Sequence, residues 1–260
     1  MVLTEERREK IRVLLSEKPY VSLNELCEMF PDLSDMTLRR DIEYFDRIGV
    51  AIKVRGGARS VKFIGDTTEA PIANRMNTSV EEKMRIAKAA SVYLEDGHSV
   101  FLDSGSTVEK VVDFTPQRKM TFITTSPQIA LALCRQGRHA VNIVGGRIDR
   151  DSLSVSGMHA MKYINDVNID IAFLSPSGFS ISGGFTCGNY SECELKSTVA
   201  KKARLVVMLM DKTKVDRVLP FTFCKLENVD VLVTDSSLPE EIVSAIDTNR
   251  TKIVYASEEL

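Results

Sequence analysis

Hydrophobic residues recur with helical spacing in three successive segments near the start of the chain. The first segment covers 4–17 and ends at Pro19. The second follows Ser22, which stands at capping-box spacing from Glu25, and the third follows Ser34. The apolar stripes consist of Ile11, Leu14 and Leu15, then Leu23, Leu26, Cys27 and Phe30, and then Leu38, Ile42 and Phe45. This pattern predicts the order helix, helix, turn, helix.

The third segment, SDMTLRRDIEYFDRIG at 34–49, has the features of a DNA-recognition helix. Ser34 is suited to the N-cap and Gly49 to the C′ position. Polar and basic side chains lie off the apolar stripe near the N-terminal end, which is where a recognition helix meets base edges. The candidate DNA contacts on this helix are Ser34, Met36, Thr37, Arg39, Arg40 and Arg47. Adjacent arginines also occur on the solvated face of ordinary helices, so the neighbouring segments must decide between these interpretations.

The segment VAIKVRGGARSVKF at 50–63 predicts two short strands joined around Gly56 and Gly57. A hairpin with a positively charged tip is typical of the wing of a winged helix, where it lies along the DNA backbone. The hairpin adds Lys53, Arg55 and Arg59 to the candidate DNA contacts. The alternative is a surface hairpin with scattered basic residues, but three helices and a hairpin within about sixty residues favour the winged helix.

From residue 80 onwards, apolar segments of strand length alternate with helical segments. This order indicates an α/β fold with a mostly parallel sheet covered by helices on both faces. The first helix is predicted from the stripe Val80, Met84, Ala87, Ser91 and Leu94.

The chain is expected to divide into two domains. Residues 1–62 are predicted to form a winged helix-turn-helix domain, and 80–260 to form an effector-sensing α/β domain. Residues 63–79 lack periodicity and contain Gly, Pro, Asn and Thr, so they are predicted to be a linker.

Ligands of parallel sheets bind beyond the carboxyl ends of the strands, and the polar and glycine-rich segments of the α/β domain fall there. The loop DSGST at 103–107 lies between a strand and a helix, so its N–H and hydroxyl groups suit a phosphate, although an N-capping turn without a ligand uses the same residues. Because several strands end in hydroxyl-rich or glycine-rich segments on the same rim of the sheet, the expected ligand is a small, oxygen-rich anion. The candidate effector-binding residues are Asp103, Ser104, Gly105, Ser106, Thr107, Thr124, Thr125, Ser126, Gly145, Gly146, Ser177, Gly178, Glu192, Glu194, Lys196, Asp211 and Lys214.

Composition limits the possible partners and cofactors. The 260-residue chain has a formal net charge of −2, so a DNA-binding surface must be local; residues 37–62 hold seven Lys and Arg against three acidic residues. The five cysteines and three histidines lack metal-site spacing, and neither a Walker loop nor a G-x-G-x-x-G loop occurs, so no metal or cofactor is expected. Without a signal core or a run of roughly 18 apolar residues, a cytoplasmic protein with no membrane contact is expected.

The motifs of both domains resemble those of the DeoR family of bacterial transcriptional regulators. The N-terminal similarity rests on S-x-x-T-L-R-R-D-I at 34–42 and R-G-G-A at 55–58, where Arg55 replaces a histidine common in the family. The C-terminal motifs are D-S-G-S-T at 103–107, V-G-G at 144–146, S-G at 177–178, N-x-x-E-x-E-x-K at 189–196 and D-x-x-K at 211–214. The resemblance implies a sensor domain similar in fold to ribose-5-phosphate isomerase, which recognises a phosphorylated sugar or related metabolite without converting it.

The sequence therefore predicts a sequence-specific DNA-binding regulator, a repressor of carbohydrate metabolism genes. It is expected to act on duplex DNA as a homo-oligomer under the control of a phosphorylated sugar. The rival is a sugar-phosphate isomerase with Glu192 or Glu194 as base and Lys214 as electrostatic partner, against which the DNA-binding domain counts. A nucleic-acid-binding protein with a purely structural C-terminal domain is a third alternative, and the converging polar loops count against it.

Overall fold

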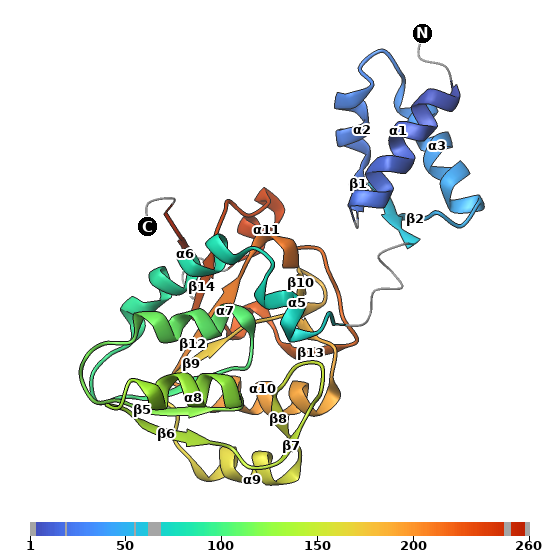
Figure 1. Ribbon diagram of the computed structural model, residues 1–260. Coiled ribbons are helices and arrows are strands. Elements are labelled where there is room, and N and C mark those ends of the chain that lie inside the picture. Colours follow the sequence, from blue (N-terminus) through green and yellow to red (C-terminus); the bar gives the residue numbers. More distant parts are fainter. Residues whose placement is uncertain (1–3, 19, 55, 62–68, 247–250, 258–260) are drawn as a thin grey trace. The chain divides into compact units, whose positions relative to one another are not determined.

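The computed structural model describes residues 4–18, 20–54, 56–61, 69–246 and 251–257. The chain folds into two compact units, Met1–Thr68 and Glu69–Leu260 (Figure 1). The first unit contains one hydrophobic core, and the second contains two.

The N-terminal unit is a winged helix, which confirms the prediction. Its elements are α1 (Thr4–Glu17), β1 (Tyr20–Ser22), α2 (Leu23–Met29), α3 (Asp35–Arg47), β2 (Ala51–Val54) and β3 (Gly57–Ser60). The strands form an antiparallel sheet in the order β1-β3-β2, so the hairpin pairs with a short strand that the sequence pattern did not predict. Gly57 allows this pairing, because a Cβ atom there would lie 2.3 Å from the carbonyl oxygen of Val21.

Helix α3 begins and ends at the predicted signals. The Ser34 hydroxyl accepts a hydrogen bond from the Thr37 N–H group at 3.4 Å, as expected of an N-cap. Gly49, just beyond the helix, has a φ of +72°, which lies in the left-handed region that favours glycine. The predicted stripe of Leu38, Ile42 and Phe45 is buried against α1, α2 and the sheet.

The C-terminal unit is built on a seven-stranded sheet, and all of its neighbouring strands are parallel. In spatial order the strands are β15 (Lys252–Tyr255), β14 (Val231–Thr234), β12 (Leu205–Met210), β9 (Ile171–Leu174), β4 (Ser99–Leu102), β5 (Thr121–Thr124) and β6 (Ala140–Ile143). Beside this sheet, an antiparallel sheet contains β10 (Gly178–Ser180), β11 (Gly184–Cys187) and β13 (Phe221–Cys224), and a short hairpin contains β7 (Arg147–Ile148) and β8 (Val155–Ser156).

Helices cover both faces of the large sheet, as predicted (Figure 1). One core lies under α6 (Val80–Ala90), α7 (Ser106–Glu109) and α8 (Pro127–Arg135), and the other under α9 (Met158–Asp166), α10 (Tyr190–Lys202) and α11 (Glu240–Ala245). Other helical segments of the described residues are α5 (Ile72–Met76) and the 3-10 turns η1 (Ser91–Tyr93), η2 (Lys110–Phe114), η3 (Lys212–Lys214) and η4 (Leu226–Asn228). Strands β4 and β9 are neighbours at the centre, and the chain runs outward from them in opposite directions.

Two details differ from the expectations drawn from the sequence. Residues 69–79, predicted as the second half of a linker, belong to the C-terminal unit and include α5, whose Ile72 is buried. The predicted stripe of α6 is correct at Ala87 and Leu94, which are buried, but wrong at Val80, which is 40% exposed. The helix also buries Lys83, Ile86 and Ala90, which the predicted stripe left out. The reason is that Lys83, a charged residue, occupies one of the inward positions.

Candidate functional site

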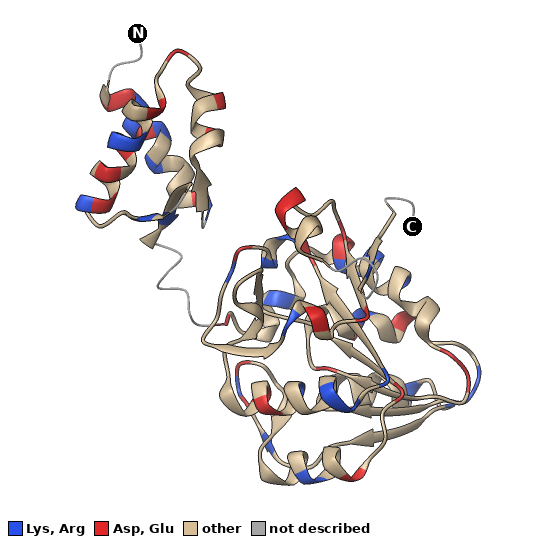
Figure 2. Cartoon of the chain, turned by 180° about the vertical axis from the view of Figure 1, so that it is seen from behind, with Lys and Arg blue, Asp and Glu red and all other residues tan. Residues whose placement is uncertain are grey.

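The exposed face of α3 carries most of the predicted DNA contacts. Arg39, Arg40 and Arg47 are exposed, and Met36 is 61% exposed. Thr37 is half-buried because it lies beside the Ser34 cap. Basic and acidic residues alternate along the helices of this unit (Figure 2).

The wing is joined to α3 by polar contacts. The Lys53 ammonium group lies 2.7 Å from a Glu43 carboxylate oxygen, and the Lys53 N–H group donates to Asp46 at 3.0 Å. Arg59 is exposed on β3, and Arg55, the third predicted contact of the wing, lies outside the described residues. The wing therefore presents basic side chains while its backbone is held against the end of α3.

Asp41 is a buried anchor of α3 that the sequence reasoning missed. Its carboxylate pairs with Arg7 at 2.5 Å and Arg8 at 2.9 Å, both from α1, and it is 1% exposed. Arg8 also lies over the ring of Tyr44 at 3.7 Å. The available signal was the position of Asp41, three residues after Leu38 and therefore on the apolar side of the helix. These pairs set the orientation of α3 on α1.

In the C-terminal unit, the loops after β4 and β9 meet where the strand order changes direction. Asp103 follows β4 and Ser175 follows β9. Gly105 allows the two loops to touch, because a Cβ atom there would lie 1.7 Å from the Ser175 hydroxyl oxygen. A switch point of this kind is where open parallel sheets bind ligands.

A buried lysine of α10 joins these loops. The Lys196 ammonium group is 2.9 Å from each of three acceptors: a carboxylate oxygen of Asp103, a carboxylate oxygen of Glu192 and the carbonyl oxygen of Ser175. Burial lowers the pKa of Lys196, but the carboxylates of Asp103 and Glu192 outweigh burial and hold this pKa well above its ordinary value. Lys196 is therefore charged.

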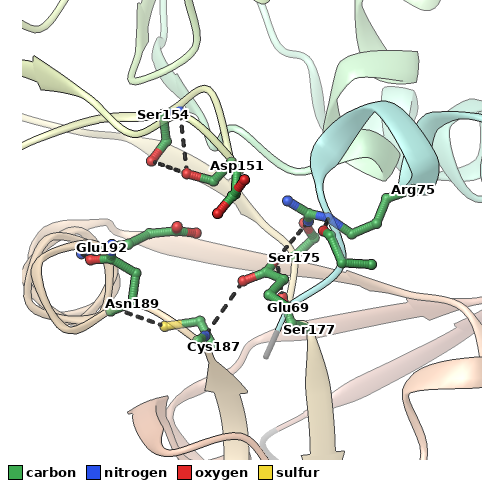
Figure 3. Close-up of polar contacts among 12 residues, drawn as sticks. Glu69, Arg75, Asp151, Ser154, Ser175, Ser177, Cys187, Asn189 and Glu192 are labelled. Atoms are coloured by element: carbon green, nitrogen blue, oxygen red, sulfur yellow. Dashed lines mark hydrogen bonds and ion pairs between the residues drawn. The ribbon is translucent and has the colours of Figure 1, made fainter. Parts of the chain in front are cut away.

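Glu192 retains one carboxylate oxygen without a partner. Its Oε1 atom pairs with Lys196, whereas its Oε2 atom is buried and accepts no hydrogen bond from any described residue. Burial raises the pKa of Glu192 despite the neighbouring lysine. Its side chain points away from α10 toward the space between Asp151 and Ser175 (Figure 3). A ligand hydroxyl that donated to this oxygen would remove the cost of leaving it unpaired.

A second group of charges lies at the end of β12. Asp211 is 1% exposed, and its Oδ2 atom has no hydrogen-bond partner within the described part of the chain. Burial lowers the pKa of Lys214 despite the attraction of Asp211, and Arg75 lowers it further. Burial also lowers the pKa of Lys83, to about 8, and Lys214 and Arg75 contribute. Because these cations repel one another, an anion among them would be stabilised.

Two charged residues from the predicted linker complete the cluster. The Arg75 guanidinium lies 2.6 Å from a Glu69 carboxylate oxygen, and Glu69 also accepts hydrogen bonds from the Ser177 hydroxyl and the Gly188 N–H group (Figure 3). The sequence reasoning missed this pair together with Lys83. The available signal was that Glu69 and Arg75 are the only charged residues in 69–79.

Some predicted effector contacts make hydrogen bonds within the fold, and others are exposed. The Thr124 hydroxyl donates to the Leu102 carbonyl at 2.7 Å, and the Ser126 hydroxyl caps α8. Glu194 is exposed, because two positions along a helix from both Glu192 and Lys196 place it on the other face. Gly145 and Gly146 are also exposed, beside the β7–β8 hairpin. Lys214 is half-buried. The remaining predicted residues are buried near the strand ends: Asp103, Ser104, Gly105, Ser106, Thr107, Thr124, Thr125, Ser126, Ser177, Gly178, Glu192, Lys196 and Asp211.

A groove of about 620 Å³ lies along the C-terminal half of α10 and strand β13. Its lining includes Lys201, Arg204 and Lys225 but none of the predicted effector contacts. The groove is therefore separate from the Lys196 cluster, whose buried unpaired oxygens give it the stronger claim as a ligand site. Among the described residues, no group of three or more His, Cys, Asp or Glu side chains is placed to hold a metal ion, and no helix is long and apolar enough to cross a membrane.

Winged helices bind DNA, and a cluster of buried polar and charged side chains at the switch point of a parallel sheet is suited to binding a small molecule. A chain with both is a DNA-binding transcriptional regulator with a small-molecule sensor domain. The DeoR-like helix-turn-helix family model matches residues 7–63, and the DeoR C-terminal sensor domain model matches residues 78–236. The chain belongs to the DeoR family.

Two relatives carry regulator names. The chain is 32% identical over 222 residues to the HTH-type transcriptional regulator IolR of Bacillus subtilis, covering 85% of this chain and 87% of the relative. It is 26% identical over 254 residues to the HTH-type transcriptional repressor CsqR of Escherichia coli, covering 97% and 96%. These similarities support a regulator and not the isomerase.

The similarity to an enzyme structure is weak. Ribose 5-phosphate isomerase A from Methanocaldococcus jannaschii is 18% identical and matches 52% of this chain and 54% of its own, with a TM-score of 0.35. A likeness at this level carries no argument about activity.

Proposed function

We propose that this regulator represses carbohydrate metabolism genes and that a phosphorylated sugar or related metabolite controls it. The observation that carries the proposal is the incompletely paired charge cluster at the switch point of the sheet, above all the buried Oε2 atom of Glu192. The name of the related repressor CsqR supports repression as the sign of regulation.

The effector is proposed to lie with its phosphate against residues 103–107. Lys214 supplies positive charge there, and its lowered pKa indicates that an anionic partner would stabilise its charged form. The sugar hydroxyls donate to Glu192 rather than to Asp103, because the Oδ2 atom of Asp103 already accepts from Lys196 and from the Ser175 N–H group at 3.1 Å.

On the DNA side, Thr37, Arg39 and Arg40 are proposed to contact base edges from the N-terminal part of α3. Lys53 and Arg59 are proposed to contact phosphates from the wing. The exposure of these four basic residues and the capped end of α3 support this division.

Effector binding is proposed to change operator affinity. An effector can do so only by binding two states of the protein unequally, and typical couplings of about 1 to 3 kcal/mol correspond to roughly 5- to 150-fold changes in affinity. The two units belong to one continuous chain. A change in the residues near the effector can therefore alter how the N-terminal unit binds DNA.

The test begins with a thermal-shift screen of the full chain against phosphorylated sugars and their unphosphorylated counterparts. A ligand at 100 times its dissociation constant should stabilise the protein by about 2.7 kcal/mol. Operator titrations with and without the best ligand then test regulation, beside an isomerisation assay on the same ligand. Enzyme-like turnover without any change in DNA affinity would overturn the proposal.

The Lys214→Ala variant tests the placement of the phosphate. It should abolish the effector response while leaving effector-free operator binding nearly unchanged, because Lys214 lies in the C-terminal unit. Lys212→Ala is the matched control, since Lys212 lies on the same turn η3 and is exposed. An equal response of the two variants would refute the assignment of Lys214.

A further inference from the structure

The segment 69–78, which we call the strap, lies between the N-terminal unit and α6 along the chain. The first unit ends at Thr68, so Glu69 is the first residue of the second unit. The strap includes α5, which is five residues long and has no side-chain cap. Its attachment to the C-terminal unit therefore depends on specific contacts and not on helix propensity.

Besides Glu69, two contacts hold the strap on the C-terminal unit: burial of Ile72, and hydrogen bonds from Lys83 to strap carbonyl groups. Ile72 is 2% exposed, and its N–H group donates to the Asp151 carbonyl at 2.7 Å. At the other end, the buried ammonium group of Lys83 donates to the carbonyl oxygens of Arg75 and of Thr78, the latter at 2.7 Å. Both anchors use backbone groups of the strap and lie away from its first residue.

Glu69 is held by a different kind of contact. Its carboxylate accepts hydrogen bonds from a hydroxyl (Ser177) and a backbone N–H group (Gly188, 3.4 Å), and it forms an ion pair with a guanidinium (Arg75, 2.6 Å). A hydroxyl, a backbone N–H and a guanidinium are the donors with which proteins bind phosphate and carboxylate ligands. Gly188 fits this role closely, since a Cβ atom there would lie 3.1 Å from the Cβ atom of Glu69.

This set of donors adjoins the proposed effector site. Burial raises the pKa of Glu69, but Arg75 and then Lys196 outweigh burial and lower it, so Lys196 acts on Glu69 as well as on Asp103 and Glu192. The side chains of Glu69 and Arg75 are only 12% and 14% exposed. A second anion that entered near Lys196 would repel Glu69 and compete for the same donors.

We propose that Glu69 is a built-in anion that occupies part of the effector's own site, and that the effector frees the start of the strap by displacing it. The proposal rests on the proposed function and adds its route of regulation. Because Glu69 directly follows the N-terminal unit along the chain, its release changes how that unit is attached to the sensor.

The test uses the full chain with inorganic phosphate and ribose 5-phosphate as probes. Glu69→Gln keeps the shape of the side chain and removes its charge, so it should bind both probes about tenfold more tightly than the natural chain, the size of effect expected when a competing charge-assisted hydrogen bond is weakened. Its operator affinity without any probe should equal that of the natural chain saturated with ribose 5-phosphate. Glu81→Gln, at an exposed glutamate of α6, is the matched control and should change neither quantity.

The possible results are distinct. If Glu69 instead accepts hydrogen bonds from sugar hydroxyls, Glu69→Gln will bind ribose 5-phosphate more weakly, and if its role is only structural, the variant will lose stability with unchanged affinity; either result overturns the inference while the proposed function stands. If neither protein binds either probe, the inference and the phosphate placement both fail.

A measurement on the natural chain covers the case in which the variant does not fold. Saturating ribose 5-phosphate should accelerate amide hydrogen exchange in peptides that cover the strap, because its first anchor is released. Slower exchange in the strap would show that the effector tightens it and would overturn the inference.

Discussion

Single buried charges organise both units of this protein. Asp41 and Lys83 each lie on a helix face that is otherwise apolar, Lys196 shares its inward face with Glu192, and each of the three is at most 2% exposed. Such a residue stabilises a fold only when its partners compensate for the loss of water, so each one depends on a particular set of neighbours. A substitution at one of these positions is therefore expected to change the free energy of unfolding more than a substitution at an exposed charge.

Asp41→Asn should destabilise the N-terminal unit by about 3 to 5 kcal/mol, because it leaves the buried Arg7 guanidinium without its charge partner. Urea unfolding followed by circular dichroism measures the change. Asp32→Asn, at an exposed aspartate of the turn before α3, is the control and should stay within about 0.5 kcal/mol. Equal unfolding midpoints for the two variants would show that the Arg7–Asp41 pair does not hold α3.

Lys83 makes stability depend on pH in the alkaline range. Its pKa of about 8 in the folded protein lies below the ordinary value of 10.5, so between these pH values the unfolded chain binds more protons than the folded chain. The penalty for burying the charge is fully present below pH 8 and is relieved as the pH rises to 10.5.

The free energy of unfolding of the natural chain, relative to Lys83→Met, should therefore rise from pH 8 to pH 10.5, by at most about 3 kcal/mol. Denaturant titrations at several pH values measure it. Lys88→Met, at an exposed position of the same helix, should show no such trend. A difference that falls with pH would contradict the sign of the shift.

Among the helices, α3 and α10 differ in the direction in which their charged side chains point. Helix α3 directs its arginines outward from an apolar stripe, whereas α10 directs Glu192 and Lys196 inward, four residues apart. An outward basic face is suited to DNA, and an inward pair at strand ends is suited to a small ligand.

Arg39→Ala and Arg40→Ala test the role of α3. A base-reading arginine changed to alanine should lose about 1 to 3 kcal/mol of operator binding and relax specificity, whereas Lys53→Ala or Arg59→Ala should weaken binding to all sequences alike. Fluorescence anisotropy at several salt concentrations distinguishes the two effects. Lys10→Ala, at an exposed lysine of α1, serves as the control. If both α3 variants keep the operator affinity and salt dependence of the natural chain, α3 is not the recognition helix.

At the scale of the whole molecule, one winged helix reads only a short half-site, so we expect a homo-oligomer. Two-fold dimers bind half-sites about one helical turn of DNA, or a multiple of it, apart. Sedimentation at micromolar concentration should show a dimer or a larger assembly, and altering the half-site spacing by about half a turn should abolish tight binding. A monomer both with and without operator DNA would refute this expectation.

Local patterns in the sequence were enough to predict the two folds and the ends of α3. The apolar periodicity, the Ser34 cap and Gly49 each depend on residues that are close together in the sequence, so they can be recognised without the tertiary structure. Candidate effector contacts could also be named from the sequence. Asp103 and Lys214 follow strands, and Glu192 and Lys196 lie in the first half of a helix, and these positions place all four near one rim of the sheet.

Which of these residues contact one another, and which further residues join them, could not be predicted from local patterns and follows from the folded structure. Glu69 contacts Ser177 and Gly188, more than a hundred residues away, and Ile72 of the short helix α5 is buried and bonded to Asp151, about eighty residues further along the chain. Lys83 lies outside the predicted apolar stripe of α6, yet it is buried, and its ammonium group donates to carbonyl groups of the strap. Periodicity is a local property of the chain, whereas the burial of a charge depends on partners that only folding brings together.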